Sequence, residues 1–371
     1  MVLLSTSEYQ NAILLPSKDI EAAGVARVAM RVLCGWLIVI LLSSLLSRPI
    51  SQLFEAPELA KYYWMLVPYV GAIGGWSIYN AWLTRYRSFG RISGYQLNQS
   101  ATSVLTKLLF GWLGWLRSGL ILSSVMAPLF ALLSSVAHSR DTFKLLWQPC
   151  DKPAREIAHL YRRFPMYSMP RSLVNNLSGN LPALLLTPYF GLNELGFFAM
   201  AITIAFRPIS MITASIHQVL FERVAKSVRD GQSISQWLRL RFIQLAAVVV
   251  PTMTVLTIIM PWLVRVFLGS GWEETSTLIR YMMPWLTCVF IVSPLAFISE
   301  VFGKQKMFLI LEIIYLLLRI GAMVIGIVMN SFVWAIILMS AVGTIVLLLQ
   351  LSIYITVIRR YESTCLSQAR E

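Results

Sequence analysis

Charged side chains are scarce in this sequence of 371 residues, since Asp, Glu, Lys and Arg together make up 13% of it and only 17 residues are acidic. Its three histidines and four cysteines follow no metal-ligand or redox spacing. No glycine-rich phosphate loop with a lysine, no nucleophile elbow and no pair of acids in a soluble domain is present. These absences exclude ATP hydrolysis on this chain, and we predict no enzymatic activity, no cofactor and no metal site.

Apolar residues are abundant instead: 57% of the chain is hydrophobic, and long apolar runs recur from end to end. A helix needs about 20 mostly apolar residues to cross about 30 Å of hydrocarbon. The composition therefore predicts an all-α integral membrane protein with about 10 transmembrane helices. These helices are expected at residues 25–47, 61–83, 101–117, 119–137, 167–189, 196–220, 242–263, 277–298, 307–327 and 332–356, with a tight turn at 116–119 between the third and fourth.

The distribution of basic residues predicts the orientation of these helices. If the N-terminus is cytoplasmic, the inside segments hold 23 of the 31 basic residues and the outside loops hold five. The remaining three, Arg171, Arg207 and Arg319, lie within predicted spans. Short cytoplasmic loops carry an excess of Lys and Arg, so both termini are expected in the cytoplasm. The net charge of +14 then reflects this topology and contact with anionic membrane lipid, and nucleic acid is not an expected partner.

A weak internal repeat predicts two lobes, because residues 63–91 resemble residues 281–309 in the order of their tyrosine, methionine, proline and basic positions. Parallel repeats of this kind are a transporter architecture with the substrate held between the halves. The second lobe has two helices without counterparts in the first, so we expect lobes of four and six helices. The predicted parts are a cytoplasmic segment 1–24, a first lobe 25–137, a basic linker 138–166, a second lobe 167–356 and a cytoplasmic tail 357–371.

The predicted helix 167–189 carries polar residues in an otherwise apolar run. A charged arginine deep in a bilayer costs about 2.5 to 3.5 kcal/mol on insertion scales, so such residues are expected to face protein or a water-filled cavity. The alternative is that the arginine extends to the lipid headgroups at the cytoplasmic end. Helical spacing places one polar stripe on a single face and two asparagines beside it: Arg171, Asn175, Ser178 and Pro182, then Asn176 and Asn180.

Two further helices carry ionisable residues. Arg207 precedes Pro208 near the middle of a predicted span. It is either a fixed cation able to bind two phosphate oxygens or a donor to the carbonyls that the proline leaves free. Glu312 and Arg319 are seven residues apart and share a helix face. Because an acid within a span can relay protons, Glu312 is the candidate for ion coupling.

The stretch YRRFPMYSMPRSLVNNLSGNLPALLLTPYFG, residues 161–191, and the following LGFFA, residues 195–199, resemble bacterial polysaccharide exporters and O-antigen flippases. Their shared pattern is a basic "YR.FP.Y..P" start, a polar helix with "LP.LLL", and then "FG" and "GF(Y)A". Residues 9–23 resemble the cytoplasmic loop between the second and third helices of this family. The family belongs to the multidrug, oligosaccharidyl-lipid and polysaccharide exporter (MOP) superfamily.

The resemblance implies a flippase for undecaprenyl-pyrophosphate-linked oligosaccharide in the bacterial inner membrane, which serves lipopolysaccharide O-antigen or other surface polysaccharide biosynthesis. It implies alternating access through a cationic cavity between the lobes, and the polysaccharide polymerase machinery as a candidate partner. The resemblance places Arg171, Asn175, Asn176, Asn180 and Arg207 in this cavity as substrate-binding residues. We expect Arg319, the third arginine within a predicted span, to bind substrate as well.

Compared with the family, the chain is expected to lack the first two helices, and an inactive truncated remnant is one alternative. Another alternative is a small-molecule antiporter of the same superfamily. A third is a membrane glycan polymerase or ligase, which would need a large outside loop.

Overall fold

The computed structural model describes residues 2–47, 57–137, 153–230 and 233–368, and within these ranges the chain is helical and contains no strand. Seven of its helices are long and apolar enough to cross a membrane, which confirms the predicted class of an all-α, multi-pass membrane protein. One of the seven, Phe164–Arg229, covers two predicted helices. The number of crossings and the side on which each terminus lies remain predictions.

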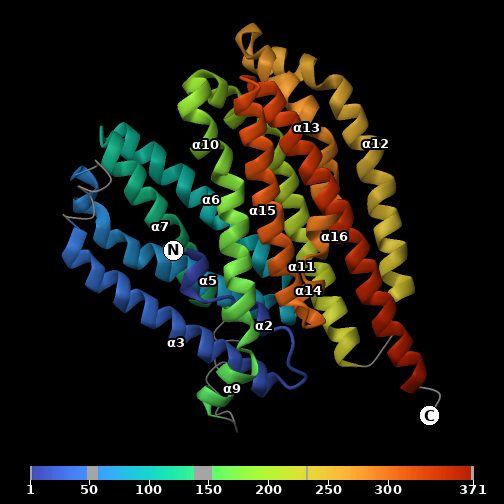
Figure 1. Ribbon diagram of the computed structural model, residues 1–371. Coiled ribbons are helices and arrows are strands. Elements are labelled where there is room, and N and C mark those ends of the chain that lie inside the picture. Colours follow the sequence, from blue (N-terminus) through green and yellow to red (C-terminus); the bar gives the residue numbers. More distant parts are fainter. Residues whose placement is uncertain (1, 48–56, 138–152, 231–232, 369–371) are drawn as a thin grey trace. The chain divides into compact units, whose positions relative to one another are not determined.

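The chain divides into two compact units, which we call unit 1 (Met1–Met169) and unit 2 (Pro170–Glu371). In unit 1, α5 (Leu66–Arg85) packs between α3 (Asp19–Ser43) and α7 (Leu116–Ala137), and α6 (Phe89–Trp112) forms a hairpin with α7 (Figure 1). The start of α6 lies twelve residues before the predicted start at residue 101. Asn98 on this polar extension donates a hydrogen bond of 2.7 Å to Ser134 Oγ of α7.

The turn between α6 and α7 differs from the prediction, because it lies at residues 113–115 and not at 116–119. Gly114 adopts φ 75° there, a left-handed conformation that costs glycine little. Gly119 lies inside α7 instead, where an added Cβ would be 2.4 Å from Phe110 Cβ. The sequence thus offers two glycines, of which one makes the turn and the other allows the two helices to approach closely.

The predicted cytoplasmic segment 1–24 is folded against the helices of unit 1. Its short helices α1 (Val2–Ser5) and α2 (Tyr9–Ala12) pack on α3 and α5, and Ala12 and Ile13 have no exposed surface. Burial raises the pKa of the Tyr9 hydroxyl, so it remains a donor and bonds the Ala158 carbonyl of α9 (Ala154–Leu160) at 3.2 Å. Most of the predicted linker, residues 138–152, lies outside the described residues.

Arg85, at the C-terminal end of α5, holds the chain that leads from α2 into α3. Its Nε and Nη2 donate to Asp19 Oδ1 at 3.0 and 2.9 Å, and its Nη1 donates to the carbonyls of Ile13 and Pro16 at 3.2 and 2.8 Å. Only 5% of the Arg85 side chain is exposed. A cation is also favourable at a helix C-terminus, so this one side chain fixes the start of α3.

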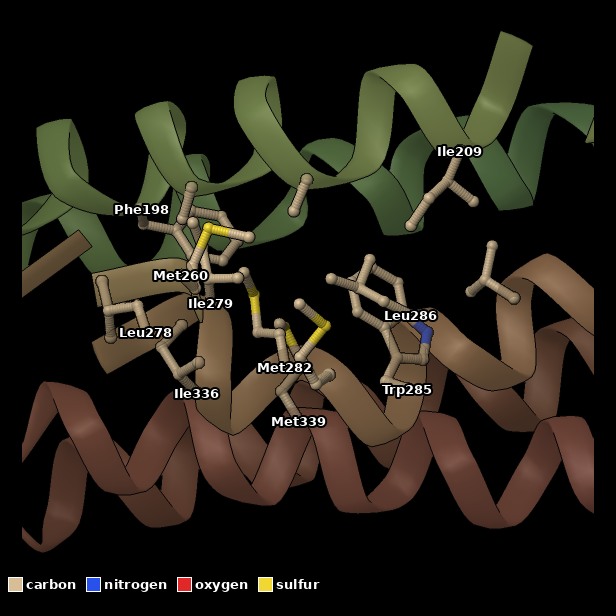
Figure 2. Packing of buried hydrophobic residues seen from close by; sticks show 14 of the residues in the cluster. Phe198, Ile209, Met260, Leu278, Ile279, Met282, Trp285, Leu286, Ile336 and Met339 are labelled. Carbon is tan, nitrogen blue, oxygen red and sulfur yellow. The ribbon is translucent and has the colours of Figure 1, made fainter. Parts of the chain in front are cut away.

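Unit 2 is a bundle built around α13 (Glu273–Val292), which packs against both α12 (Ser235–Leu268) and α16 (Phe332–Gln368) (Figure 1). Of its apolar stretch 67% is buried, against 11 to 39% for the other candidate spans. Figure 2 shows Met282 and Leu286 of α13 between Ile209 of α11 on one side and Met339 of α16 on the other. The other helices of unit 2 include α10 (Met169–Ala201), α11 (Arg207–Arg229), α14 (Ile298–Val301) and α15 (Gln305–Val328).

Two irregularities shape the segment from α10 to α11. Gly191 has φ 82° and ψ 177°, so α10 consists of two helical parts that meet where the sequence predicts a break between residues 189 and 196. A π-helical turn, Ile202–Phe206, then precedes Arg207 and Pro208. Wider turns of this kind occur as local bulges within helices, often at functional sites.

Candidate functional site

Polar side chains of α10 and α15 meet within unit 2. Asn175 Nδ2 donates to Glu312 Oε1 at 2.8 Å, and Arg319 Nη1 donates to Ser178 Oγ at 2.9 Å. Asn175 and Ser178 are three residues apart and Glu312 and Arg319 are seven apart, so each pair lies on one helix face. We call these four residues together with Arg171 the polar seam. Its members on α10 are those of the predicted stripe apart from Pro182; of these, Ser178 is buried, Arg171 is partly buried and Asn175 is exposed.

Arg319 is the most buried charge of the seam, with 5% of its surface exposed. Its Nη2 lies 3.2 Å from Met339 Sδ, and its guanidinium carbon lies 5.4 and 5.7 Å from the ring centres of Tyr315 and Trp285. Aromatic faces attract cations at such distances. Its Nε has no hydrogen-bond partner among the described residues. The protein thus holds a cation with one donor still unused.

Trp285 and Tyr315 keep their places because Gly343 of α16 has no side chain. An added Cβ at Gly343 would lie 2.4 Å from Trp285 Cδ1 and 2.9 Å from Tyr315 Oη. On its other side Trp285 stacks on Phe206, with ring centres 6.0 Å apart and planes at 9°. The position of Arg319 therefore depends on four helical segments of unit 2.

Arg171 lies at the start of α10 and is partly buried. It donates a hydrogen bond to Ser299 Oγ of α14. In this structure the Arg171 side chain is hydrogen-bonded to another helix of unit 2. This contact differs from the predicted alternative, in which the side chain extends to the lipid headgroups. Glu312 lies within electrostatic range of both Arg171 and Arg319. An acid is thus placed where two cations act on it.

Three of the predicted site residues do not join the seam. Asn176 and Asn180 are exposed and donate to backbone carbonyls of their own helix, at Ser172 and Asn176, both at 2.9 Å. Arg207 is exposed at the start of α11, and no hydrogen bond of its guanidinium is found in the part of the chain that the structure describes. The alternative in which Arg207 bonds carbonyls freed by Pro208 is therefore not observed.

A cavity of about 540 Å³ lies between α11, α12 and α13, and Arg207 is not among the residues that line it. Pro208 lines it together with apolar side chains, and Thr252 is its one polar lining residue. Its lining includes Ile209, Ile212, Met253, Met260 and Phe290. A cavity with this lining suits a hydrocarbon chain. The exposed Arg207 directly precedes Pro208, one of the lining residues, in the chain.

The sequence interpretation did not name several residues that complete the seam. Tyr315 lies three residues after Glu312 and four before Arg319, so helical spacing could have placed it on the same face. Trp285, Ser299, Met339 and Gly343 come from other helices, and no spacing within one segment indicates them. Among the described residues, no three His, Cys, Asp or Glu side chains gather as a metal site. The seam offers charge and hydrogen bonds for binding an anion and hydroxyl groups.

A model of the family described as "Polysaccharide biosynthesis protein" matches residues 11–277. This range contains unit 1 almost entirely, all of α10 and α11, and Arg171 and Arg207. No curated protein matches the sequence.

Solved transporter structures share the fold across nearly the whole chain. The structure of MATE in the bent conformation is 15% identical, with a TM-score of 0.76 over 98% of this chain and 85% of that one. The Vibrio cholerae MATE transporter VcmN in the bent form is 15% identical, with a TM-score of 0.74 over 97% and 84%. A MOP superfamily transporter from Pyrococcus furiosus, whose binding pocket is described as having reverse polarity, is 15% identical, with a TM-score of 0.74 over 97% and 85%.

Proposed function

The chain belongs to the polysaccharide biosynthesis protein family, in the MOP superfamily, and from this premise we propose that it flips a lipid-linked oligosaccharide across a bacterial inner membrane. The substrate is an undecaprenyl-pyrophosphate-linked oligosaccharide made for O-antigen or another surface polysaccharide. Family and fold support membrane transport in general. The finer proposal rests on the chemistry of unit 2.

The observation that carries the proposal is the polar seam, in which Arg171 and Arg319 are held within apolar helices. A guanidinium is always charged and can bind two phosphate oxygens at once. Cations within a membrane span usually mark a substrate or ion pathway. The pyrophosphate is the charged part of the substrate, so these two arginines are proposed to bind it during transport.

The rest of the substrate requires different chemistry. Asn176 and Asn180 are exposed, and their amide groups retain capacity to bond sugar hydroxyls. The apolar cavity lined by Pro208 is proposed to receive part of the isoprenoid chain, since burying hydrocarbon contributes about 0.8 kcal/mol per CH₂ group. Arg207 would then bind phosphate at the junction between chain and headgroup.

Glu312 is proposed to couple the cycle to ions. When ionised, it accepts a hydrogen bond from Asn175 and lies in the field of two arginines. Protonation would remove the negative charge and increase the net positive charge of the seam. The anionic substrate would then bind more strongly, so proton uptake and substrate binding would favour each other.

The experiment is complementation in a bacterial host that lacks its own flippase, with surface glycan as the readout. Arg207→Ala is expected to abolish glycan display while membrane insertion and protein level stay normal. The matched control is Arg265→Ala, which removes an exposed arginine whose partner is the exposed Glu273, a pair that contributes little to stability. Normal display from Arg207→Ala would remove this residue from the proposed site.

A further inference from the structure

A second cleft in unit 2, of about 430 Å³, lies between α12 and α16, and none of its lining residues belongs to the polar seam. Its wall is formed mainly by apolar side chains, and Tyr354, one of the lining residues, is fully buried. Arg239 of α12 and Arg359 of α16 line the cleft together with Glu362. The apolar lining includes Leu238, Phe242, Leu295, Leu351, Ile355 and Ile358.

The two arginines of this cleft are free to bind an anion. Both are exposed, and neither forms a hydrogen bond or ion pair with any residue that the structure describes. Glu362, the acid of the cleft, accepts a hydrogen bond of 2.8 Å from Ser233. Two positive charges therefore face an apolar cleft, and the one negative charge beside them is already hydrogen-bonded.

This cleft lies at the basic end of unit 2, where α12 and α15 begin and α11 and α16 end (Figure 1). The segments at this end, residues 221–230, 233–241, 299–308 and 358–363, contain nine basic and four acidic residues. The segments at the opposite end, residues 190–197, 265–281 and 327–333, contain two basic and three acidic residues. The cationic cleft thus lies at the end of the bundle where anionic headgroups are attracted.

We propose that the cleft between α12 and α16 is a binding site for an anionic phospholipid. The phosphate lies between Arg239 and Arg359, and one acyl chain lies along the apolar wall. A free phosphate would leave this wall exposed to water, and a soluble peptide would not reach helices whose neighbouring turns lie in lipid. Basic pockets between transmembrane helices are known to bind such headgroups, and this site does not depend on the proposed transport function.

The experiment compares phosphatidylglycerol with phosphatidylcholine, using native mass spectrometry and thermal unfolding of the purified full-length chain. Each basic residue near an anionic lipid changes affinity by about fivefold. The double variant Arg239→Gln/Arg359→Gln should therefore bind phosphatidylglycerol about 30-fold more weakly. Phosphatidylcholine should bind weakly to all proteins. The matched control is Lys226→Gln/Arg241→Gln, which removes two exposed charges from the same end but outside the cleft.

The apolar wall has its own test, Ile355→Asn, which keeps both arginines. It should weaken binding of phosphatidylglycerol and leave the much weaker binding of glycerol phosphate unchanged. Equal losses in the cleft variant and the control would overturn the proposal, because the attraction would then be unspecific. A loss confined to Lys304→Gln/Arg360→Gln, which alters the neighbouring cleft between α15 and α16, would also overturn it.

Discussion

Replacing Gly326 by Ala tests the packing that places Arg319 against α16. Gly326 lies seven residues after Arg319, on the same face of α15. An added Cβ would be 2.4 Å from both Cα and Cβ of Ala335 and 2.6 Å from its backbone nitrogen. Favourable contacts between carbon atoms need about 3.5 to 4.0 Å, so α15 and α16 would have to separate by roughly 1 Å. The atoms that the added Cβ would meet include backbone atoms of α16, which cannot move away as the end of a flexible side chain could.

The expected cost of this overpacking is about 1 to 3 kcal/mol. Gly321→Ala is the matched control, since it makes the same chemical change in the same helix where no atom lies within 4 Å. Alanine there should stabilise the helix by about 0.5 to 1 kcal/mol. The same gain applies to Gly326→Ala, so the two variants should differ by the overpacking cost alone, about 1 to 3 kcal/mol.

Thermal unfolding of the purified variants measures this difference. A domain of this size loses about 2 to 4 °C of Tm for each kcal/mol, so Gly326→Ala should melt about 2 to 12 °C below Gly321→Ala. If the Tm of Gly326→Ala equalled or exceeded that of Gly321→Ala, Gly326 would not pack closely against α16. The account of how Met339 reaches Arg319 would then also fail.

Three further outcomes follow from the seam and from unit 1. Arg319→Lys should fold, because the charge is kept, but should lose most glycan display. A single ammonium cannot reproduce both the contact of the guanidinium with the Tyr315 ring and its hydrogen bond to Ser178; normal display would contradict this role. Glu312→Gln should flatten the pH dependence of transport in vesicles, and an unchanged pH profile would discard the coupling proposal. Arg85→Ala should remove the bonds that hold the start of α3. Because Asp19 is half exposed and its ion pair contributes little, the loss comes mainly from the carbonyls of Ile13 and Pro16, and the free energy of unfolding of unit 1 should fall by about 1 to 3 kcal/mol; unchanged protease sensitivity of residues 13–19 would contradict this.

The sequence predicted the class of fold well, because long apolar runs identify helices in lipid whatever their neighbours are. It also grouped Arg171, Asn175 and Ser178 correctly on one face, since helical spacing is a local property. It did not indicate that Trp285 and Met339 complete the surroundings of Arg319, because contacts between distant segments leave no spacing within either segment. The turn at Gly114 was missed for a related reason: Gly119 offered an equal turn signal, and only its packing against Phe110 distinguishes the two.

Local sequence patterns also did not indicate that the first residues of unit 1 pack against its helices. The acidic residues Glu8, Asp19 and Glu21 indicate a polar, cytoplasmic segment. Ala12 and Ile13 are nevertheless fully buried, because they belong to one apolar cluster with residues of α3, α5 and α9. Arg85 supplies the bonds for this arrangement from 66 residues further along the chain. A contact between residues this far apart in the sequence can be identified only from the folded structure.

The most direct test of the central proposal is flipping of a fluorescent undecaprenyl-pyrophosphate-linked oligosaccharide by the purified chain in vesicles. A membrane-impermeant glycosidase added outside reports how much substrate reaches the outer leaflet. We predict that the wild-type chain makes the inner-leaflet pool accessible and that Arg171→Ala slows this by about tenfold or more, the loss expected for a charge-assisted hydrogen bond. A wild-type rate equal to that of protein-free vesicles would contradict the proposed function.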